Sequence, residues 1–71
     1  MKVKDLISHL IVKDIYITTQ TELKYYSSDG GISFKTGVLS KPDPELTYNI
    51  YNARVKWLKP ENNYAVYIMI E

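Results

Sequence analysis

The stretch that decides the fold is ARVKWLKPENNYAVYIMIE, Ala53 to Glu71, which predicts two strands joined by a polar turn. Apolar residues alternate in its first half, and Pro60-Glu61-Asn62-Asn63 has the composition of a four-residue turn. The second half, Tyr64 to Ile70, is apolar on both faces. A strand in a small antiparallel sheet normally shows one polar face to water. The sequence therefore leaves open what covers the second face of this strand.

The alternation also predicts a register for this hairpin, because a slip of one residue would turn a whole strand inside out. The expected pairs are Trp57 with Val66 and Val55 with Ile68, flanked by Lys59 with Tyr64 and Ala53 with Ile70. This register places Trp57 in the core.

Residues 46–57 allow two interpretations. In the first, strands at 46–51 and 53–58 are separated by a bulge or break near Ile50, where the apolar phase changes. In the second, a helix begins with Asp43 as its cap and Pro44 at its first position, and it buries Leu46, Ile50, Ala53 and Trp57. Thr, Tyr, Asn and Ile are poor helix formers, so the strands are preferred.

Residues 15–26 alternate with apolar side chains at odd positions, which predicts one long bent strand or two strands broken near Thr19-Gln20-Thr21. Asp29-Gly30 then predicts a two-residue hairpin turn, since Asp-Gly readily adopts positive φ. The following strand, Ile32 to Leu39, would pair Phe34 with Tyr25.

Apolar residues at i, i+3, i+4, i+7 and i+8 from Val3 predict a short helix over Val3 to Val12. The expected fold is therefore α+β, with one short N-terminal helix packed on one face of a small antiparallel sheet of four to five strands. Residues 1–71 are expected to form a single domain. The expected core is Leu6, Ile7, Leu10, Ile15, Ile17, Leu23, Phe34, Val38, Val55, Trp57, Val66, Ile68 and Ile70.

The composition of the chain excludes several classes of protein and of binding site. The chain has 71 residues, no Cys and a net charge of +1, so disulfide scaffolds and thiolate metal sites are excluded and there is no overall attraction to nucleic acid. No apolar run is long enough to span a membrane, and the first residues lack a secretory signal, so we expect a cytoplasmic protein. With His9 as the sole histidine and no recognisable motif, no catalytic residue, cofactor or metal site is predicted, and the protein is not expected to be an enzyme.

The candidate site is the sheet face opposite the helix. Its predicted partner-binding residues are basic or aromatic, with one methionine: Lys24, Tyr26, Lys35, Arg54, Lys56, Tyr67 and Met69. Tyr, Met and Arg are enriched in protein interfaces, which favours a protein partner. Aromatic rings with cations can also bind single-stranded nucleic acid, which is the less favoured alternative. A third possibility is a homodimer formed through the C-terminal strand, if that strand is a sheet edge.

Met1 to Leu10, MKVKDLISHL, resembles the start MKVxDLIxxL of small uncharacterised proteins from bacteriophages and mobile elements of Gram-positive bacteria. The resemblance covers about ten residues and the order of helix, then strands. It implies a phage or prophage accessory protein or inhibitor in the host cytoplasm. Together with the candidate face, it predicts a small non-enzymatic binding protein that acts by protein–protein contact through a Tyr-rich sheet face or edge.

Overall fold

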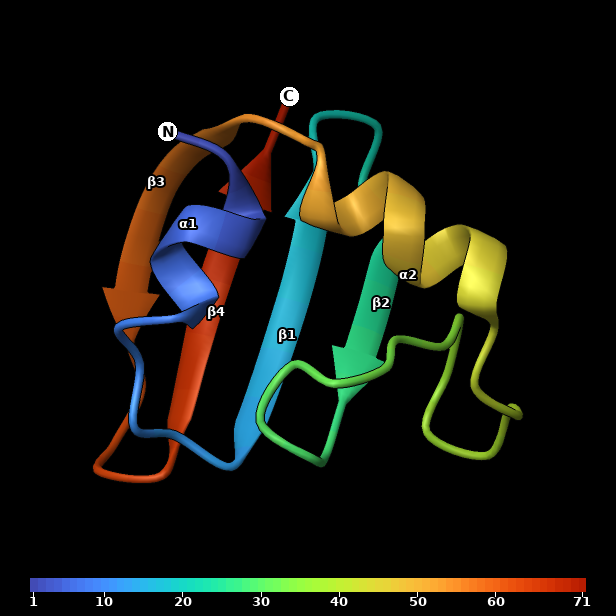
Figure 1. Cartoon of the computed structure of the whole chain (residues 1–71), viewed down its shortest axis with the longest axis horizontal. Helices are drawn as coiled ribbons and strands as arrows, with labels where there is room; N and C mark the ends of the chain where they lie inside the picture. Colours follow the sequence, from blue (N-terminus) through green and yellow to red (C-terminus); the bar gives the residue numbers. More distant parts are fainter.

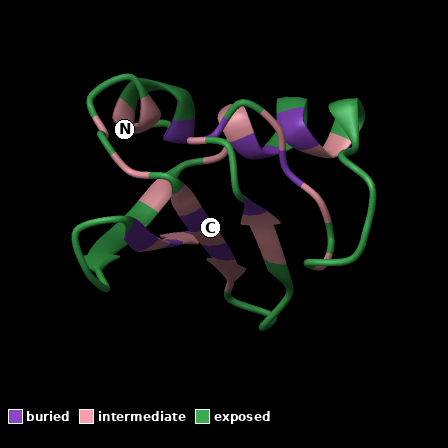
Figure 2. Ribbon diagram, turned by 90° about the horizontal axis from the view of Figure 1, so that it is seen from below, coloured by how far each residue is buried: buried purple, intermediate pink, exposed green.

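Two helices and a four-stranded sheet form the two layers of this protein (Figure 1). The computed structural model describes residues 1–71. The elements in chain order are α1 (Val3–Ile7), β1 (Asp14–Thr19), β2 (Lys24–Ser27), α2 (Pro44–Tyr51), β3 (Val55–Pro60) and β4 (Ala65–Ile70). Both helices cover the same face of the sheet, as the view from below shows (Figure 2).

The α+β class is confirmed, but the sheet is mixed rather than purely antiparallel. Its strand order is β2-β1-β4-β3. The pairs β1–β2 and β3–β4 are antiparallel, whereas β1 and β4 run parallel, with Ile15 opposite Val66 and Ile17 opposite Ile68. A parallel pair needs a long crossover, and the segment containing α2 supplies one between the two hairpins.

The central position of β4 explains its two apolar faces. Val66, Ile68 and Ile70 are buried beneath the helices, while Tyr67 and Met69 on the opposite face are flanked by side chains of β1 and β3. Both backbone edges of β4 are paired, so the interpretation of the C-terminal strand as a sheet edge is wrong. A homodimer would have to use another surface.

Residues 44–51 form the helix α2, so the preferred strand interpretation is wrong and the alternative helix is confirmed there. The Asp43 carboxylate accepts hydrogen bonds from the backbone N–H groups of Glu45 at 3.0 Å and Leu46 at 3.2 Å, and Pro44 occupies the first turn. Burial of Ile50 and this cap outweigh the weak helix propensity of the sequence. The chain leaves the helix before Trp57, which belongs to β3.

Thr47 joins α2 to the neighbouring loop. Its buried hydroxyl accepts a hydrogen bond from the Phe34 backbone N–H at 2.8 Å and donates to the Asp43 carbonyl at 2.8 Å. The Asp43 N–H in turn donates to the Phe34 carbonyl at 3.0 Å. These bonds hold Phe34 in the core beside the helix.

The alternating segment 15–26 breaks into β1 and β2, one of the two forms that the sequence allowed. Glu22 adopts a positive φ of 62° in the turn, and Thr19 Oγ1 accepts a hydrogen bond from the Leu23 N–H at 3.1 Å. The hydroxyls of Thr19 and Thr21 also bond each other at 3.0 Å. The turn thus closes on its own side chains.

The strand predicted over Ile32 to Leu39 does not form, and the predicted Asp29-Gly30 register is wrong. Within residues 32–39, only Lys35 pairs with β2, by two backbone hydrogen bonds with Tyr26 at 2.9 and 3.0 Å. The Asp29 carboxylate accepts bonds from the hydroxyls of Ser27 at 2.7 Å and Ser33 at 2.8 Å. These bonds gather residues 27–33 into a wider loop instead of a two-residue turn.

The register of the C-terminal hairpin also differs from the prediction. Trp57 lies opposite Met69 and Lys59 lies opposite Tyr67, three positions along β4 from the expected partners. Because three is odd, the shift moves Trp57 to the face away from the helices, where it is 43% exposed. A bulge between Val55 and Trp57 leaves Val55 opposite Ile70.

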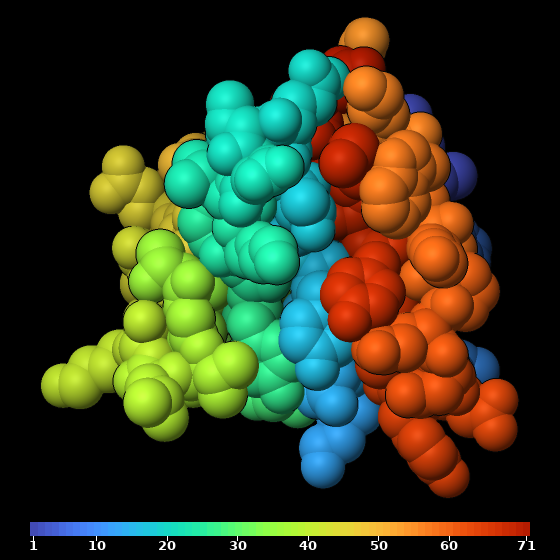
Figure 3. All heavy atoms as spheres, turned by 180° about the vertical axis from the view of Figure 1, so that it is seen from behind, coloured from blue at the N-terminus to red at the C-terminus, as the bar shows by residue number.

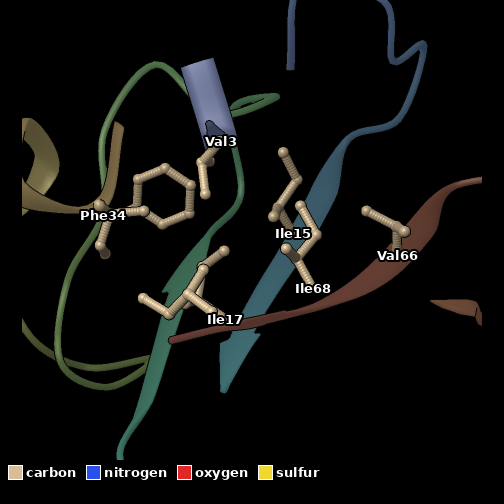
Figure 4. Close-up of a cluster of buried hydrophobic side chains, with 8 residues drawn as sticks. Val3, Ile15, Ile17, Phe34, Val66 and Ile68 are labelled. Carbon is tan, nitrogen blue, oxygen red and sulfur yellow. The ribbon is translucent and has the colours of Figure 1, made fainter. Parts of the chain in front are cut away.

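Eight buried residues form the core between the two layers (Figure 4): Val3, Ile15, Ile17, Phe34, Ile50, Val66, Ile68 and Ile70. The prediction of Leu23, Val38 and Trp57 as core residues is wrong, since they are 54%, 64% and 43% exposed. Val3 and Ile50 were not among the predicted core residues: Val3 was placed on the apolar stripe of the helix but not in the core, and Ile50 was buried only in the alternative helix interpretation.

The N-terminal helix ends at Ile7 rather than Val12, so Ile11 lies outside it and is almost fully exposed. Leu6, Ile7 and Leu10 are half-buried and pack against the core as expected. The helix is short because the chain must turn to enter β1, where the Lys13 and Asp14 N–H groups both donate to the Tyr64 carbonyl at 2.9 Å.

Candidate functional site

The face of the sheet opposite the helices carries most of the aromatic and basic strand residues (Figure 3). Successive strand residues point to opposite faces, so side chains that alternate with the buried Ile15, Ile17, Val66 and Ile68 point away from the helices. This open face consists of Lys24, Tyr26, Tyr16, Thr18, Tyr67, Met69, Trp57 and Lys59.

The register arranges these eight residues in two rows across the strands. The first row is Tyr26, Tyr16, Tyr67 and Lys59, and the second is Lys24, Thr18, Met69 and Trp57. Each row takes one residue from β2, β1, β4 and β3 in that order. Residues far apart in sequence therefore become direct neighbours.

The three tyrosines of the first row, Tyr26, Tyr16 and Tyr67, form the tyrosine row. The ring centroids of Tyr16 and Tyr26 lie 5.1 Å apart at an interplanar angle of 40°, and those of Tyr16 and Tyr67 lie 5.0 Å apart at 29°. These separations are close to the strand spacing of about 4.8 Å. Rings lying flat on the sheet would collide at that distance, so the rings stand on the sheet with their faces turned toward one another.

Lysines occupy both ends of the tyrosine row. Lys35 is brought to Tyr26 by the backbone bridge beside β2, and its Nζ lies 5.5 Å from the Tyr26 ring centroid, within the range of a cation–π interaction. Lys59 lies directly opposite Tyr67 on β3. The outer ring face of Tyr26 is thus covered by a cation rather than left open.

Carboxylates lie beside the hydroxyls of the outer two tyrosines. The Tyr26 hydroxyl donates to Asp14 Oδ1 at 3.1 Å, and burial followed by the interaction with Asp14 raises the Tyr26 pKa. Burial followed by the nearby Glu61 carboxylate raises the Tyr67 pKa. Both tyrosines are therefore neutral hydrogen-bonding groups at ordinary pH, and the face carries charges of both signs.

The structure brings together most of the sequence-predicted site residues. Lys24, Tyr26, Tyr67 and Met69 lie on the open face, and Lys35 lies against Tyr26. Arg54 precedes β3 and pairs with Lys2 at the end of the sheet, and Lys56 is the residue displaced by the bulge, so neither belongs to the two rows.

Four residues of the open face were not among the predicted site residues: Tyr16, Thr18, Trp57 and Lys59. Tyr16 and Thr18 share the parity of Lys24 and Tyr26, so the alternation contained the signal for them. Trp57 and Lys59 could not be placed on this face without the correct register of β3 on β4.

No pocket is found in the structure, and no group of three or more His, Cys, Asp or Glu side chains is arranged to hold a metal ion. None of the helices has the length and apolar character needed to cross a membrane. The open face is therefore the candidate functional site, as a surface rather than a cavity.

Comparisons with protein-family models, with curated proteins and with solved structures found no match to this chain.

Proposed function

We propose that this protein is a small non-enzymatic binding protein that docks a protein partner on its open face. The observation that carries this proposal is the tyrosine row, three half-buried rings of neighbouring strands whose centroids lie 5.0 and 5.1 Å apart on one face of the sheet. These tyrosines, Met69 and the half-exposed Trp57 give a surface of mixed polarity, which is typical of protein interfaces.

The ring geometry favours a protein partner over nucleic acid. Stacked bases are about 3.4 Å apart, so a base inserted between two rings needs a gap of roughly 7 Å. The rings of the tyrosine row are 5.0 and 5.1 Å apart at their centroids, which leaves no such gap. A base inserted between neighbouring tyrosines would have to separate the rings first.

The charges of the open face also favour a protein partner over nucleic acid. Lys24, Lys35 and Lys59 border the aromatic residues, but Asp14 and Glu61 lie beside two tyrosine hydroxyls and would repel phosphates. A protein surface can place acidic residues against the lysines and hydrogen-bond donors against the two carboxylates. A phosphate backbone offers only negative charge.

Nucleic-acid binding is the second candidate, because three lysines surround four aromatic side chains on one face. Titrating a labelled thymidine oligonucleotide and a labelled uridine oligonucleotide at two salt concentrations tests it. Phosphate contacts would give an affinity that falls steeply with salt. We expect no binding at either concentration, and salt-dependent binding lost in Lys24→Glu would replace the protein proposal with this one.

The protein proposal is tested by affinity capture with matched variants. Tyr67→Glu alters the centre of the open face, whereas Tyr48→Glu alters an exposed tyrosine on α2 in the helical layer. We expect a protein from a Gram-positive bacterial lysate to bind the wild type and Tyr48→Glu but not Tyr67→Glu. Equal retention by both folded variants would reject the open face as the contact surface.

The choice of lysate follows from a further proposal, that the protein is a phage or prophage accessory protein or inhibitor acting in the host cell. Its support is the resemblance of Met1 to Leu10 to the start of such proteins. If the captured protein is a host enzyme or defence component, adding purified protein should change that component's activity.

A further inference from the structure

The sheet has a free backbone edge at β3. The first part of this edge is occupied by the N-terminal segment, since the Val55 N–H donates to the Met1 carbonyl at 2.9 Å and the Val3 N–H donates to the Ala53 carbonyl at 3.0 Å. Beyond Val55, residues 57–60 pair only with β4, and Lys56 is the bulged residue between them. The outward backbone groups of that stretch therefore have no partner within the chain.

Apolar side chains accompany the free edge. Trp57 is 43% exposed and Leu58 is 37% exposed. Trp57 pairs with Met69 on the open face, whereas Leu58 pairs with the buried Ile68, so the two side chains lie on opposite faces of the strand. Each has a β4 neighbour on one side and none on the other. A strand added at this edge would supply the missing neighbours on both faces.

The charges of this edge identify the chemistry of its occupant. Lys56 and Lys59 are exposed on β3, Arg54 and Lys2 are exposed at the bridge beside it, and β3 itself contains no acidic residue. An extended segment with two adjacent apolar residues flanked by acidic residues would place one apolar side chain on each face, beside Trp57 and beside Leu58, and its carboxylates near these cations.

A second copy of the chain is a poorer occupant. Two copies of β3 paired edge to edge would bring Lys56 and Lys59 against the same residues of the other copy, and like charges opposite each other are destabilising. The bulge after Val55 and the missing N–H of Pro60 limit regular pairing with any added strand to the short stretch between them. Lysine, proline and bulges are the features by which natural edge strands avoid self-association.

We propose that the β3 edge, residues 56–59, binds an acidic extended peptide segment of a partner by strand addition. Backbone hydrogen bonds to β3 provide the affinity, and the lysines select acidic side chains over basic ones. The free β3 edge carries this proposal, which is separate from the proposed docking on the open face.

The test uses the fluorescence of Trp57, the only tryptophan, while the capped hexapeptide Glu-Glu-Val-Val-Glu-Glu is titrated into the 71-residue protein. We expect saturable binding, a blue shift of Trp57 emission as the added strand shields it, and slower hydrogen exchange of the β3 amides. The matched peptide with Lys in place of Glu should bind at least roughly tenfold more weakly. The same peptide N-methylated at every residue should not bind, because it lacks all backbone donors.

Protein variants separate this site from the open face. Lys56→Glu should weaken binding of the acidic peptide, whereas Lys41→Glu, an exposed loop lysine, should leave it nearly unchanged. Tyr16→Ala removes the centre of the tyrosine row without touching β3 and should also leave it unchanged. The proposal would be overturned if the wild type bound no peptide or if it bound the Glu and Lys peptides equally well. A dimer that shields Trp57 in the absence of peptide would also overturn it.

Discussion

The contact between Tyr16 and Tyr67 provides the sharpest test of the open face, because it exists only if β1 and β4 pair in parallel and in this register. The two residues are directly opposite, with ring centroids 5.0 Å apart at 29°. Aromatic pairs of this kind contribute about 0.5–1.5 kcal/mol beyond the area that they bury. A double-mutant cycle with Tyr16→Ala, Tyr67→Ala and the double variant should therefore give a coupling energy of about 0.5–1.5 kcal/mol.

Urea unfolding followed by circular dichroism is a suitable assay. A domain of this length is expected to have an unfolding free energy of about 4–11 kcal/mol, which leaves room to measure both single variants. Comparing midpoints at a constant m-value converts each transition to a free-energy change without a long extrapolation.

The control is the pair Tyr26 and Tyr67, which lie in the same row but are separated by Tyr16. Their effects should add to within about 0.3–0.5 kcal/mol, as for residues that do not touch. A coupling near zero for Tyr16 with Tyr67, or an equally large coupling in the control pair, would refute the arrangement of the tyrosine row.

Three further predictions concern stability. Thr47→Val should lower the unfolding free energy by about 1–3 kcal/mol in urea because the buried Phe34 N–H loses its acceptor at 2.8 Å, whereas Thr47→Ser should cost much less. Gly31→Ala should lower it by about 1–3 kcal/mol in the same assay, since Gly31 has a φ of 92° and a Cβ there would lie 2.9 Å from Ile7 Cγ2. The raised pKa of Tyr26 favours its neutral form in the folded state, so its contribution is complete below a pH of about 10 and is lost as pH rises through the folded pKa. An absorbance titration of tyrosinate should lose one of its transitions above pH 10 in Tyr26→Phe, and an unchanged titration curve would contradict that assignment.

The sequence by itself determined the local features of this protein. Period-two alternation over residues 15–26 indicated that Tyr26 and Lys24 share a face opposite Ile15 and Ile17, and this holds in β1 and β2. The Asp43-Pro44 pair contained the correct start of α2, because a cap and a first-turn proline depend only on neighbouring residues. The helix was only the alternative prediction for this segment, because Thr, Tyr and Asn have low intrinsic helix propensity.

Only the tertiary structure decided which residues meet on the open face. Alternation determines the two faces of a single strand but contains no information about the strand beside it or the offset between them. The β3–β4 offset that brought Trp57 and Lys59 to the open face, and the parallel pairing that put Tyr16 against Tyr67, come from packing α2, Phe34 and both hairpins around one core. That packing is a property of the whole chain, because the burial that stabilises each pairing involves residues distant in sequence.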